Sequence, residues 1–183
     1  MSIEIICGPM FSGKTEELIR RITRAKYARQ TVITFKPDID QRYSLYHIQS
    51  HSGSQEECII VKDSNEILKT IEKEKPDLIA IEEAQFFEHE SFVNTIKTLN
   101  ANRINVIVAG LDMDFMGNPF ENIIFVMGIA QKVDKISAVC VVCGNEGTMT
   151  YKKNLNSKRV EVGETNLYEA RCYDCWHKRL ERN

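Results

Sequence analysis

One eight-residue segment, residues 8–15 (GPMFSGKT), limits the fold more than any other feature of the sequence. It matches the pattern G-x-x-x-x-G-K-[ST] in full, follows the apolar run IEII and precedes a helical pattern. Glycines in this pattern let the backbone turn until several N–H groups face one anion, and the next helix adds positive potential from its N-terminus. The segment therefore predicts a strand, a phosphate-binding loop and a helix, in that order.

The same pattern predicts contacts with a nucleoside triphosphate. Lys14 would neutralise the β- and γ-phosphates, and the Thr15 hydroxyl would bind Mg²⁺. The other candidates for phosphate contacts are the remaining residues of the loop and one arginine of a later loop, which could help to neutralise the transferring phosphate: Gly8, Pro9, Met10, Phe11, Ser12, Gly13 and Arg42.

Short apolar runs rich in β-branched residues recur along the first three quarters of the chain. They predict strands at residues 3–7, 31–35, 58–61, 77–82 and 104–110. The runs are nearly continuous rather than alternating, as expected of strands covered on both faces, and helical patterns lie between them. We therefore predict an α/β fold of the P-loop (RecA-like) class for residues 1–139, with a mainly parallel sheet flanked by helices.

Composition and charge exclude other classes of protein. Hydrophobic residues make up 43% and charged residues 27%, and the formal net charge of -2 gives no global reason to bind nucleic acid. A basic run on the first helix, from Arg20 to Arg29, is expected to be a solvated face. Because no signal peptide and no apolar run of about 18 residues is present, we expect a cytoplasmic protein that binds neither membrane nor nucleic acid.

Two acidic residues lie at the end of the predicted strand at residues 77–82: Glu82 is its last residue, and Glu83 follows it directly. Adjacent residues on a strand point in opposite directions, so we assign the two side chains different roles. Glu82 is predicted to contact Mg²⁺, directly or through water, together with Thr15. Glu83 is predicted to face a second substrate, where it could accept the proton of an attacking hydroxyl group.

Two long polar segments, residues 36–56 and 111–122, interrupt the regular alternation and contain aromatic residues. Loops of this length inside a compact domain are usually functional or mobile. Among the phenylalanines near the acidic pair and in the second loop, we assign Phe86, Phe115 and Phe120 to the wall of a substrate pocket.

Two Cys-x-x-Cys pairs mark a second, smaller unit at residues 140–183. Each pair supplies two thiolates on a tight turn, and two such turns complete a tetrahedral site, which predicts structural Zn²⁺. The predicted ligands are Cys140, Cys143, Cys172 and Cys175, and His177 is expected to lie on the surface. The metal would clip the ends of the polar segment 144–171, which could then close over a ligand.

Taken together, five segments in order resemble the thymidine kinase family, whose members combine a P-loop domain with a zinc-bearing lasso domain. These segments are GPMFSGKT, EEAQFF, GLDMDF with the following PF, KISAVCVVCG and VEVGETNLYEARCYDC. The resemblance implies an ATP:thymidine 5′-phosphotransferase that also accepts deoxyuridine, requires Mg²⁺, uses Glu83 as general base, forms a homotetramer and is inhibited by dTTP.

The resemblance also implies a thymidine pocket, and this sequence departs from the family pattern at two positions. The pocket residues would be Met10, Phe86, Leu111, Phe115, Phe120, Thr150, Val160, Val162, Gly163 and Tyr168. Glu82 stands where the family usually has aspartate. Lys152 stands where the family has arginine, and because lysine lacks the bidentate guanidinium, no role is assigned to it.

Two other functions fit part of this pattern. A nucleotide-switched nucleic-acid binder should present a basic zinc-binding segment, but residues 144–171 contain five basic and four acidic side chains. A plain ATPase would use Glu83 to position water, and it would leave the aromatic loops without a purpose. The kinase hypothesis uses all of these features.

Overall fold

The centre of the protein is a six-stranded sheet with the strand order β5-β2-β6-β7-β1-β8. The computed structural model describes residues 2–39, 46–50, 52–153 and 167–178. Every pairing in this sheet is parallel, which confirms the predicted fold class. The strands are β1 (Ile3–Gly8), β2 (Val32–Pro37), β5 (Ile59–Val61), β6 (Leu78–Ile81), β7 (Asn105–Leu111) and β8 (Lys132–Lys135).

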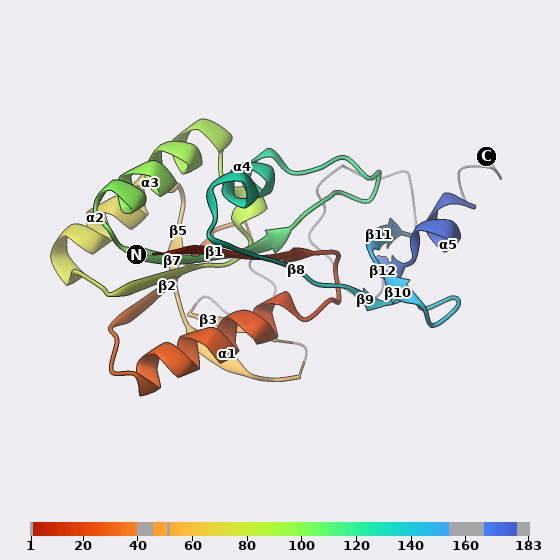
Figure 1. Ribbon diagram of the computed structural model, residues 1–183, viewed down its shortest axis with the longest axis horizontal. Helices are drawn as coiled ribbons and strands as arrows, with labels where there is room; N and C mark the ends of the chain where they lie inside the picture. Colours follow the sequence, from red (N-terminus) through yellow and green to blue (C-terminus); the bar gives the residue numbers. More distant parts are fainter. Residues whose placement is uncertain (1, 40–45, 51, 154–166, 179–183) are drawn as a thin grey trace.

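Helices cover both faces of the sheet (Figure 1). One face carries α1 (Lys14–Tyr27), and the other carries α2 (Asn65–Glu74), α3 (His89–Ala101) and α4 (Glu121–Ile129). None of the helices among the described residues is both long enough and apolar enough to cross a membrane.

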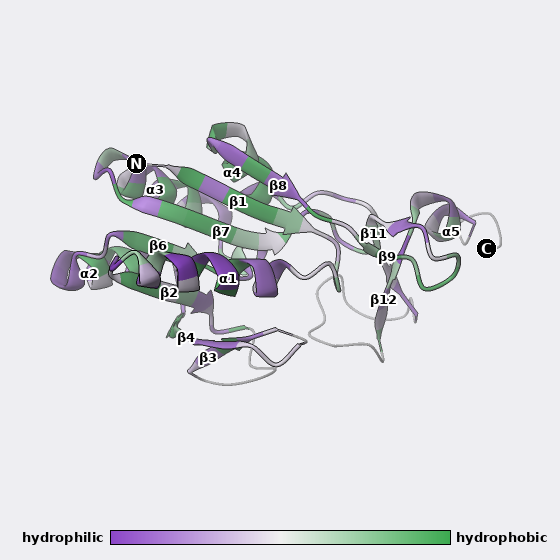
Figure 2. Ribbon diagram, turned by 60° about the horizontal axis from the view of Figure 1, so that its bottom comes forward, coloured by the Kyte–Doolittle hydropathy of each residue, from purple (hydrophilic) through white to green (hydrophobic). Residues whose placement is uncertain are grey.

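The side chains of β7 show why the sequences of the strands are continuous apolar runs. Val106 and Val108 pack in the cluster shared with α2, α3 and α4, whereas Ile107 and Ala109 pack in the cluster shared with α1. Successive residues of a strand face opposite sides, so a sheet covered on both faces needs an apolar residue at every position. Figure 2 shows the central strands as mainly hydrophobic and α1 as hydrophilic on its outer side.

Two elements of this domain, α4 and β8, do not follow the sequence patterns used for prediction. The α4 sequence, ENIIFVMGI, is apolar around most of its circumference and so lacks the 3.6-residue periodicity of an amphipathic helix. The β8 sequence, KVDK, is polar and largely exposed because β8 is an edge strand. Both elements are specified by their tertiary position rather than by local periodicity.

The sequence predicted that the basic run of α1 forms a solvated face, and this prediction fails at Arg21. Arg21 is 9% exposed, and its guanidinium contacts Glu4 at 2.6 Å, Glu17 at 2.8 Å and also Asp134. These carboxylates come from β1, α1 and β8, so one arginine joins the helix to two strands. Arg20, in contrast, is exposed and pairs with Glu17.

The cysteine-containing segment forms two small antiparallel sheets beside the carboxyl ends of the main strands (Figure 1). Its elements are β10 (Glu146–Gly147), β11 (Met149–Lys152), β12 (Tyr168–Arg171) and α5 (Tyr173–His177). β10 pairs with β9 (Ala138–Val139), which directly precedes Cys140. A third small pair, β3 (His47–Gln49) and β4 (Gln55–Glu57), lies within the first long polar segment. The division of the chain at residues 139 and 140 stays a prediction.

Candidate active site

The phosphate-binding loop connects β1 to α1, and two of its glycines are required by geometry. Gly8 has φ of +149°, and a Cβ placed there would lie 2.1 Å from the carbonyl oxygen of Ile136. Gly13 has φ of +83°, in the left-handed region that side chains disfavour. The loop therefore depends both on its own conformation and on the chain that leaves β8.

Lys14 lies inside this loop. Its Nζ donates a 2.7 Å hydrogen bond to the carbonyl oxygen of Pro9. Burial lowers the pKa of Lys14, while the carboxylates of Glu83, Glu82 and Asp112 act in the opposite direction. A partly desolvated ammonium group held in the loop is well suited to meet the charge of a triphosphate.

Glu82 lies directly beside the first turn of α1. The Thr15 hydroxyl donates a hydrogen bond to Glu82 Oε1 at 2.7 Å, and Glu82 is only 6% exposed. Since β7 lies between β1 and β6, the Glu82 side chain spans one intervening strand to reach the loop. A hydroxyl and a carboxylate oxygen at this distance are hard donors of the kind that Mg²⁺ prefers, so the donor set fits this ion.

The backbone at Glu83 differs from the strand conformation that the sequence predicted for this region. β6 ends at Ile81, so neither carboxylate belongs to the strand. Glu83 instead has φ of 51° and precedes the short 3-10 helix η1 (Ala84–Phe86). The left-handed backbone, rather than strand alternation, therefore sets the direction of the Glu83 side chain, whose hydrogen-bond partner, Gln85, differs from that of Glu82.

Gln85 holds Glu83 in place, and sequence reasoning missed this residue. Its side-chain amide donates a hydrogen bond to Glu83 Oε2, and its carbonyl oxygen accepts one from the Leu111 backbone N–H at 3.1 Å. Gln85 is 7% exposed. The only available sequence signal was its position two residues after the acidic pair, which says nothing about the contact with β7.

Three side chains of the cysteine-containing segment and the second long loop meet at one point. Lys152 is 1% exposed, and its Nζ lies 5.0 Å from the ring centroid of Phe115 and 5.4 Å from that of Tyr168. Cation–π attraction stabilises this arrangement. The structure thus gives Lys152 a location between two residues predicted to line the nucleoside pocket.

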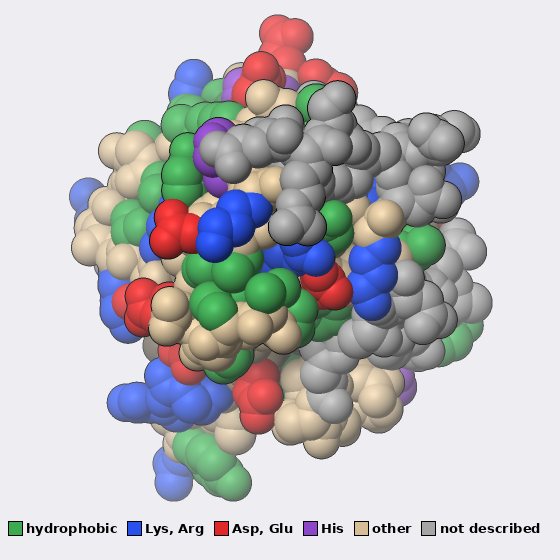
Figure 3. All heavy atoms as spheres, turned by 90° about the vertical axis from the view of Figure 1, so that its right-hand side faces the viewer, with side chains coloured by type: hydrophobic (Ala, Val, Ile, Leu, Met, Phe, Trp, Pro, Cys, Tyr) green, Lys and Arg blue, Asp and Glu red, His purple; other side chains and the backbone are tan. Residues whose placement is uncertain are grey.

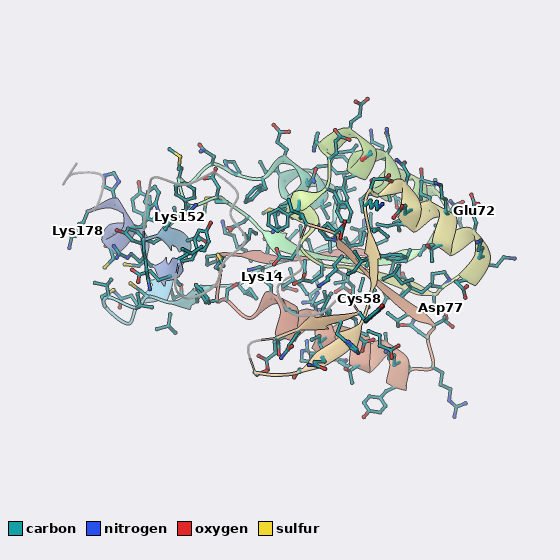
Figure 4. All side chains as sticks on the ribbon, turned by 180° about the vertical axis from the view of Figure 1, so that it is seen from behind. Lys14, Cys58, Glu72, Asp77, Lys152 and Lys178 are labelled. Carbon is teal, nitrogen blue, oxygen red and sulfur yellow. The ribbon has the colours of Figure 1, made fainter. Side chains whose placement is uncertain are left out.

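The phosphate-binding loop also contacts this segment directly. The Met10 backbone N–H donates a 3.0 Å hydrogen bond to the Thr150 hydroxyl. Figure 4 shows Lys14 between the main sheet and the segment that carries Lys152, with Glu72 at the opposite end of the molecule. Met10, which is predicted to contact both substrates, and Thr150, which is predicted to line the thymidine pocket, are therefore neighbours.

The remaining predicted site residues fall into three groups. Phe11 and Ser12 lie in the phosphate-binding loop, where the Ser12 hydroxyl donates a 2.9 Å hydrogen bond to the Pro9 carbonyl oxygen. Phe86 and Phe120 are half-buried, and the Phe120 backbone N–H donates to the Asp112 carbonyl oxygen at 3.0 Å, which ties Phe120 to the end of β7. The others lie outside the described residues: Arg42, Val160, Val162 and Gly163.

Four cysteines form a cluster that could hold a metal ion. The sulfur atoms of Cys140, Cys143, Cys172 and Cys175 all lie within 4.8 Å of one another. A tetrahedral Zn²⁺ site with bonds of about 2.3 Å requires sulfur separations of about 3.8 Å, so the cluster fits this ion. His177 is not a member of the cluster and stacks on the Tyr173 ring, with centroids 5.6 Å apart.

Two comparisons with known proteins indicate the same family. Residues 1–176 match the family described as Thymidine kinase. A protein named Thymidine kinase from Bacteroides thetaiotaomicron is 45% identical over 174 residues, covering 95% of this chain and 86% of the relative. A solved structure described as a DNA replication initiation factor aligns with a TM-score of 0.44 and 16% identity over 74% of this chain and 40% of its own, a likeness too remote to bear on function.

Proposed function

Because the chain belongs to the thymidine kinase family, we propose that it transfers the γ-phosphate of ATP to the 5′-hydroxyl of thymidine or deoxyuridine. The products are the nucleoside 5′-monophosphate and ADP. What carries the proposal is the different contacts of Glu82 and Glu83: Glu82 accepts a hydrogen bond from Thr15 of the phosphate-binding loop, and Glu83 accepts one from Gln85, whose carbonyl oxygen accepts from Leu111.

The phosphate-binding loop would hold the donor. Backbone N–H groups of the loop and the N-terminus of α1 would bind the phosphates, and Lys14 would balance charge on the β- and γ-phosphates. Thr15 and Glu82 would hold Mg²⁺, which supplies charge neutralisation to the phosphates when bound. The predicted contribution of Arg42 to the transferring phosphate belongs to the same step.

Glu83 would act on the acceptor. The 5′-oxygen of the nucleoside attacks the γ-phosphorus, a new P–O bond forms, and the bond between this phosphorus and the β,γ-bridging oxygen breaks. Glu83 receives the hydroxyl proton as the bond forms, so charge does not accumulate on the attacking oxygen. Gln85 supports this step because its amide fixes the direction of the carboxylate.

The second long loop and β11 would form the nucleoside pocket. Phe115, Leu111 and Phe86 would line it from the main domain, and Thr150 and Tyr168 would line it from the cysteine-containing segment. Val160, Val162 and Gly163 stay predictions for the same pocket. A wall contributed by both units would exclude water from the reacting phosphate, as phosphoryl transfer requires.

The four cysteines would bind a structural Zn²⁺. Four thiolates fill a tetrahedral site and leave no open position for water or substrate, so the ion would stabilise the fold of β9, β10 and α5. A homotetramer, inhibition by dTTP and a cytoplasmic location are further expectations from the family.

Nucleic-acid binding is less well supported. Among the described side chains visible on the face that carries the cysteine-containing segment, hydrophobic, basic and acidic groups are mixed (Figure 3). A nucleic-acid-binding surface would gather positive charge along one groove.

A nucleoside panel tests the proposal. Protein, labelled ATP and Mg²⁺ are incubated with thymidine, deoxyuridine, deoxycytidine or deoxyadenosine, or with no nucleoside. We expect rapid formation of ADP and labelled monophosphate with the first two only. Equal release of phosphate without a nucleoside, or preference for a purine nucleoside, would contradict it.

A further inference from the structure

Trp176 connects the metal-binding cluster to the wall of the candidate nucleoside pocket. It follows Cys175 directly in the sequence, is 8% exposed and is the single tryptophan of the chain. Its indole N–H donates a buried 3.1 Å hydrogen bond to the backbone carbonyl oxygen of Phe115, 61 residues away.

The loop that receives this hydrogen bond is compact. Asp114 Oδ1 accepts hydrogen bonds of 2.9 Å from the backbone N–H groups of Met116 and Asn118. The indole ring packs against the turn, because a Cβ added at Gly117 would lie 3.3 Å from its Cη2 atom. These hydrogen bonds tie the residues on either side of Phe115 to one another, so a contact at the Phe115 carbonyl oxygen restrains the loop that carries this side chain.

The other side of Trp176 is held by the cysteine cluster. Its backbone N–H donates to the carbonyl oxygen of Cys172 at 3.0 Å within α5. Cys172 and Cys175 supply two of the four clustered thiols. The backbone of Trp176 is therefore held by residues that would bind the metal ion, and its indole ring is held by the loop that contains Phe115.

We propose that Trp176 is a positioning residue for the nucleoside: it holds Phe115 at the location set by the metal-binding cluster. This inference rests on the proposed function, which places Phe115 against thymidine. Since the donor phosphates bind the loop at residues 8–15, Trp176 should affect the nucleoside much more than ATP.

The substitution Trp176→Phe tests the inference because it removes the N–H donor and keeps an aromatic ring. The buried carbonyl of Phe115 then lacks its partner, and we expect the KM for thymidine to rise about five- to tenfold. The KM for ATP and kcat should change by less than about twofold. Metal content, measured by mass spectrometry, should stay at the wild-type value. Tyr173→Phe, on the same helix and 58% exposed, is the matched control and should leave all four quantities unchanged.

A double-mutant cycle shows whether the effect passes through Phe115. In a Phe115→Leu background, Trp176→Phe should raise the thymidine KM much less than in the wild type, because the two residues act as one unit. Additive effects of the two substitutions, or equal rises in the KM values for ATP and thymidine, would overturn the proposal.

Fluorescence of the wild-type protein gives a test that needs no variant. All tryptophan emission comes from Trp176, so saturating thymidine should change its intensity or its quenching by acrylamide, and ATP alone should not. No response to thymidine, or an equal response to ATP, would contradict the proposal. If the wild type phosphorylates thymidine and Trp176→Phe keeps the wild-type thymidine KM, only this inference fails. If the wild type does not phosphorylate thymidine, the proposed function itself fails.

Discussion

The Thr15 hydroxyl donates a 2.7 Å hydrogen bond to the Glu82 carboxylate, joining the first turn of α1 to the end of β6. The two residues are 67 positions apart in the sequence and come from elements separated by β7. Their contact places a hydroxyl and a carboxylate oxygen at the mouth of the phosphate-binding loop.

Removing the charge of Glu82 should weaken the binding of Mg²⁺ beside Thr15. Glu82→Gln keeps an oxygen that can accept the Thr15 hydrogen bond but loses the negative charge that attracts the cation. We expect the Mg²⁺ concentration for half-maximal rate to rise at least about tenfold. Initial rates at fixed ATP and varied Mg²⁺ measure this. Glu72→Gln, on the exposed side of α2, is the control, and an unchanged Mg²⁺ dependence would remove Glu82 from this role.

Removing the proposed general base should affect turnover rather than binding. Glu83→Gln is expected to lower kcat by about 10² to 10⁴, because the proton of the attacking hydroxyl loses its acceptor. Isothermal titration should show nearly unchanged affinity for ATP and thymidine. A kcat close to that of the wild type would show that another group accepts the proton.

Gln85 should matter through its contact with Glu83. In Gln85→Leu the carboxylate loses its donor, and we expect kcat to fall about tenfold while the KM for ATP changes little. The Leu111 N–H also loses its acceptor, so unfolding in urea should show a loss of about 1–3 kcal/mol. Gln55→Leu, at an exposed position of β4, serves as the control. A loss of stability without any fall in kcat would indicate a purely structural residue.

The cysteine cluster should bind about one zinc ion per chain. Cys143→Ser replaces a soft thiolate by a poor zinc ligand, so metal content and thermal stability should both fall. Cys58→Ala, a cysteine remote from the cluster (Figure 4), should retain the metal. Metal-free protein with full activity and unchanged stability would contradict a structural role.

Arg21 should stabilise the protein most at neutral pH. Hydrogen bonds from Arg20, and then from Arg21, lower the pKa of Glu17 from 4.5 to about 2, and a hydrogen bond from Arg21 lowers that of Asp134. Depressed carboxyl pKa values contribute stability above the unfolded-state value, and this stability is lost as the pH falls from about 4.5 toward 2.

Arg21→Met should therefore cost about 1–3 kcal/mol at pH 7, less than a fully buried pair because the carboxylates stay partly exposed. The difference from the wild type should shrink as the carboxyl groups are protonated. Denaturant unfolding at pH 7 and pH 3 measures both values. Arg24→Met, at an exposed position of α1, is the control, and a cost that is independent of pH would show that Arg21 acts through packing alone.

Local chemistry made part of this protein predictable from sequence alone. Gly8 and Gly13 indicate a backbone conformation that other residues disfavour. Continuous apolar runs predict strands covered on both faces, and paired cysteines predict a metal site. In each case the signal lies within a few neighbouring residues, because it follows from covalent spacing and backbone preference.

Tertiary structure alone decided the contacts between distant residues. The sequence predicted that Arg21 is a surface residue, because nothing local indicates its contact with Asp134, which is 113 positions away. Gln85 and Trp176 carried no local signal, since their partners Leu111 and Phe115 lie 26 and 61 positions away. Sequence periodicity reports which face of an element is buried, whereas hydrogen bonds and ion pairs across elements depend on how those elements pack. Thus the sequence determined that a phosphate loop and a thiolate cluster exist, and the packing of β7, η1 and α5 decided how they are joined.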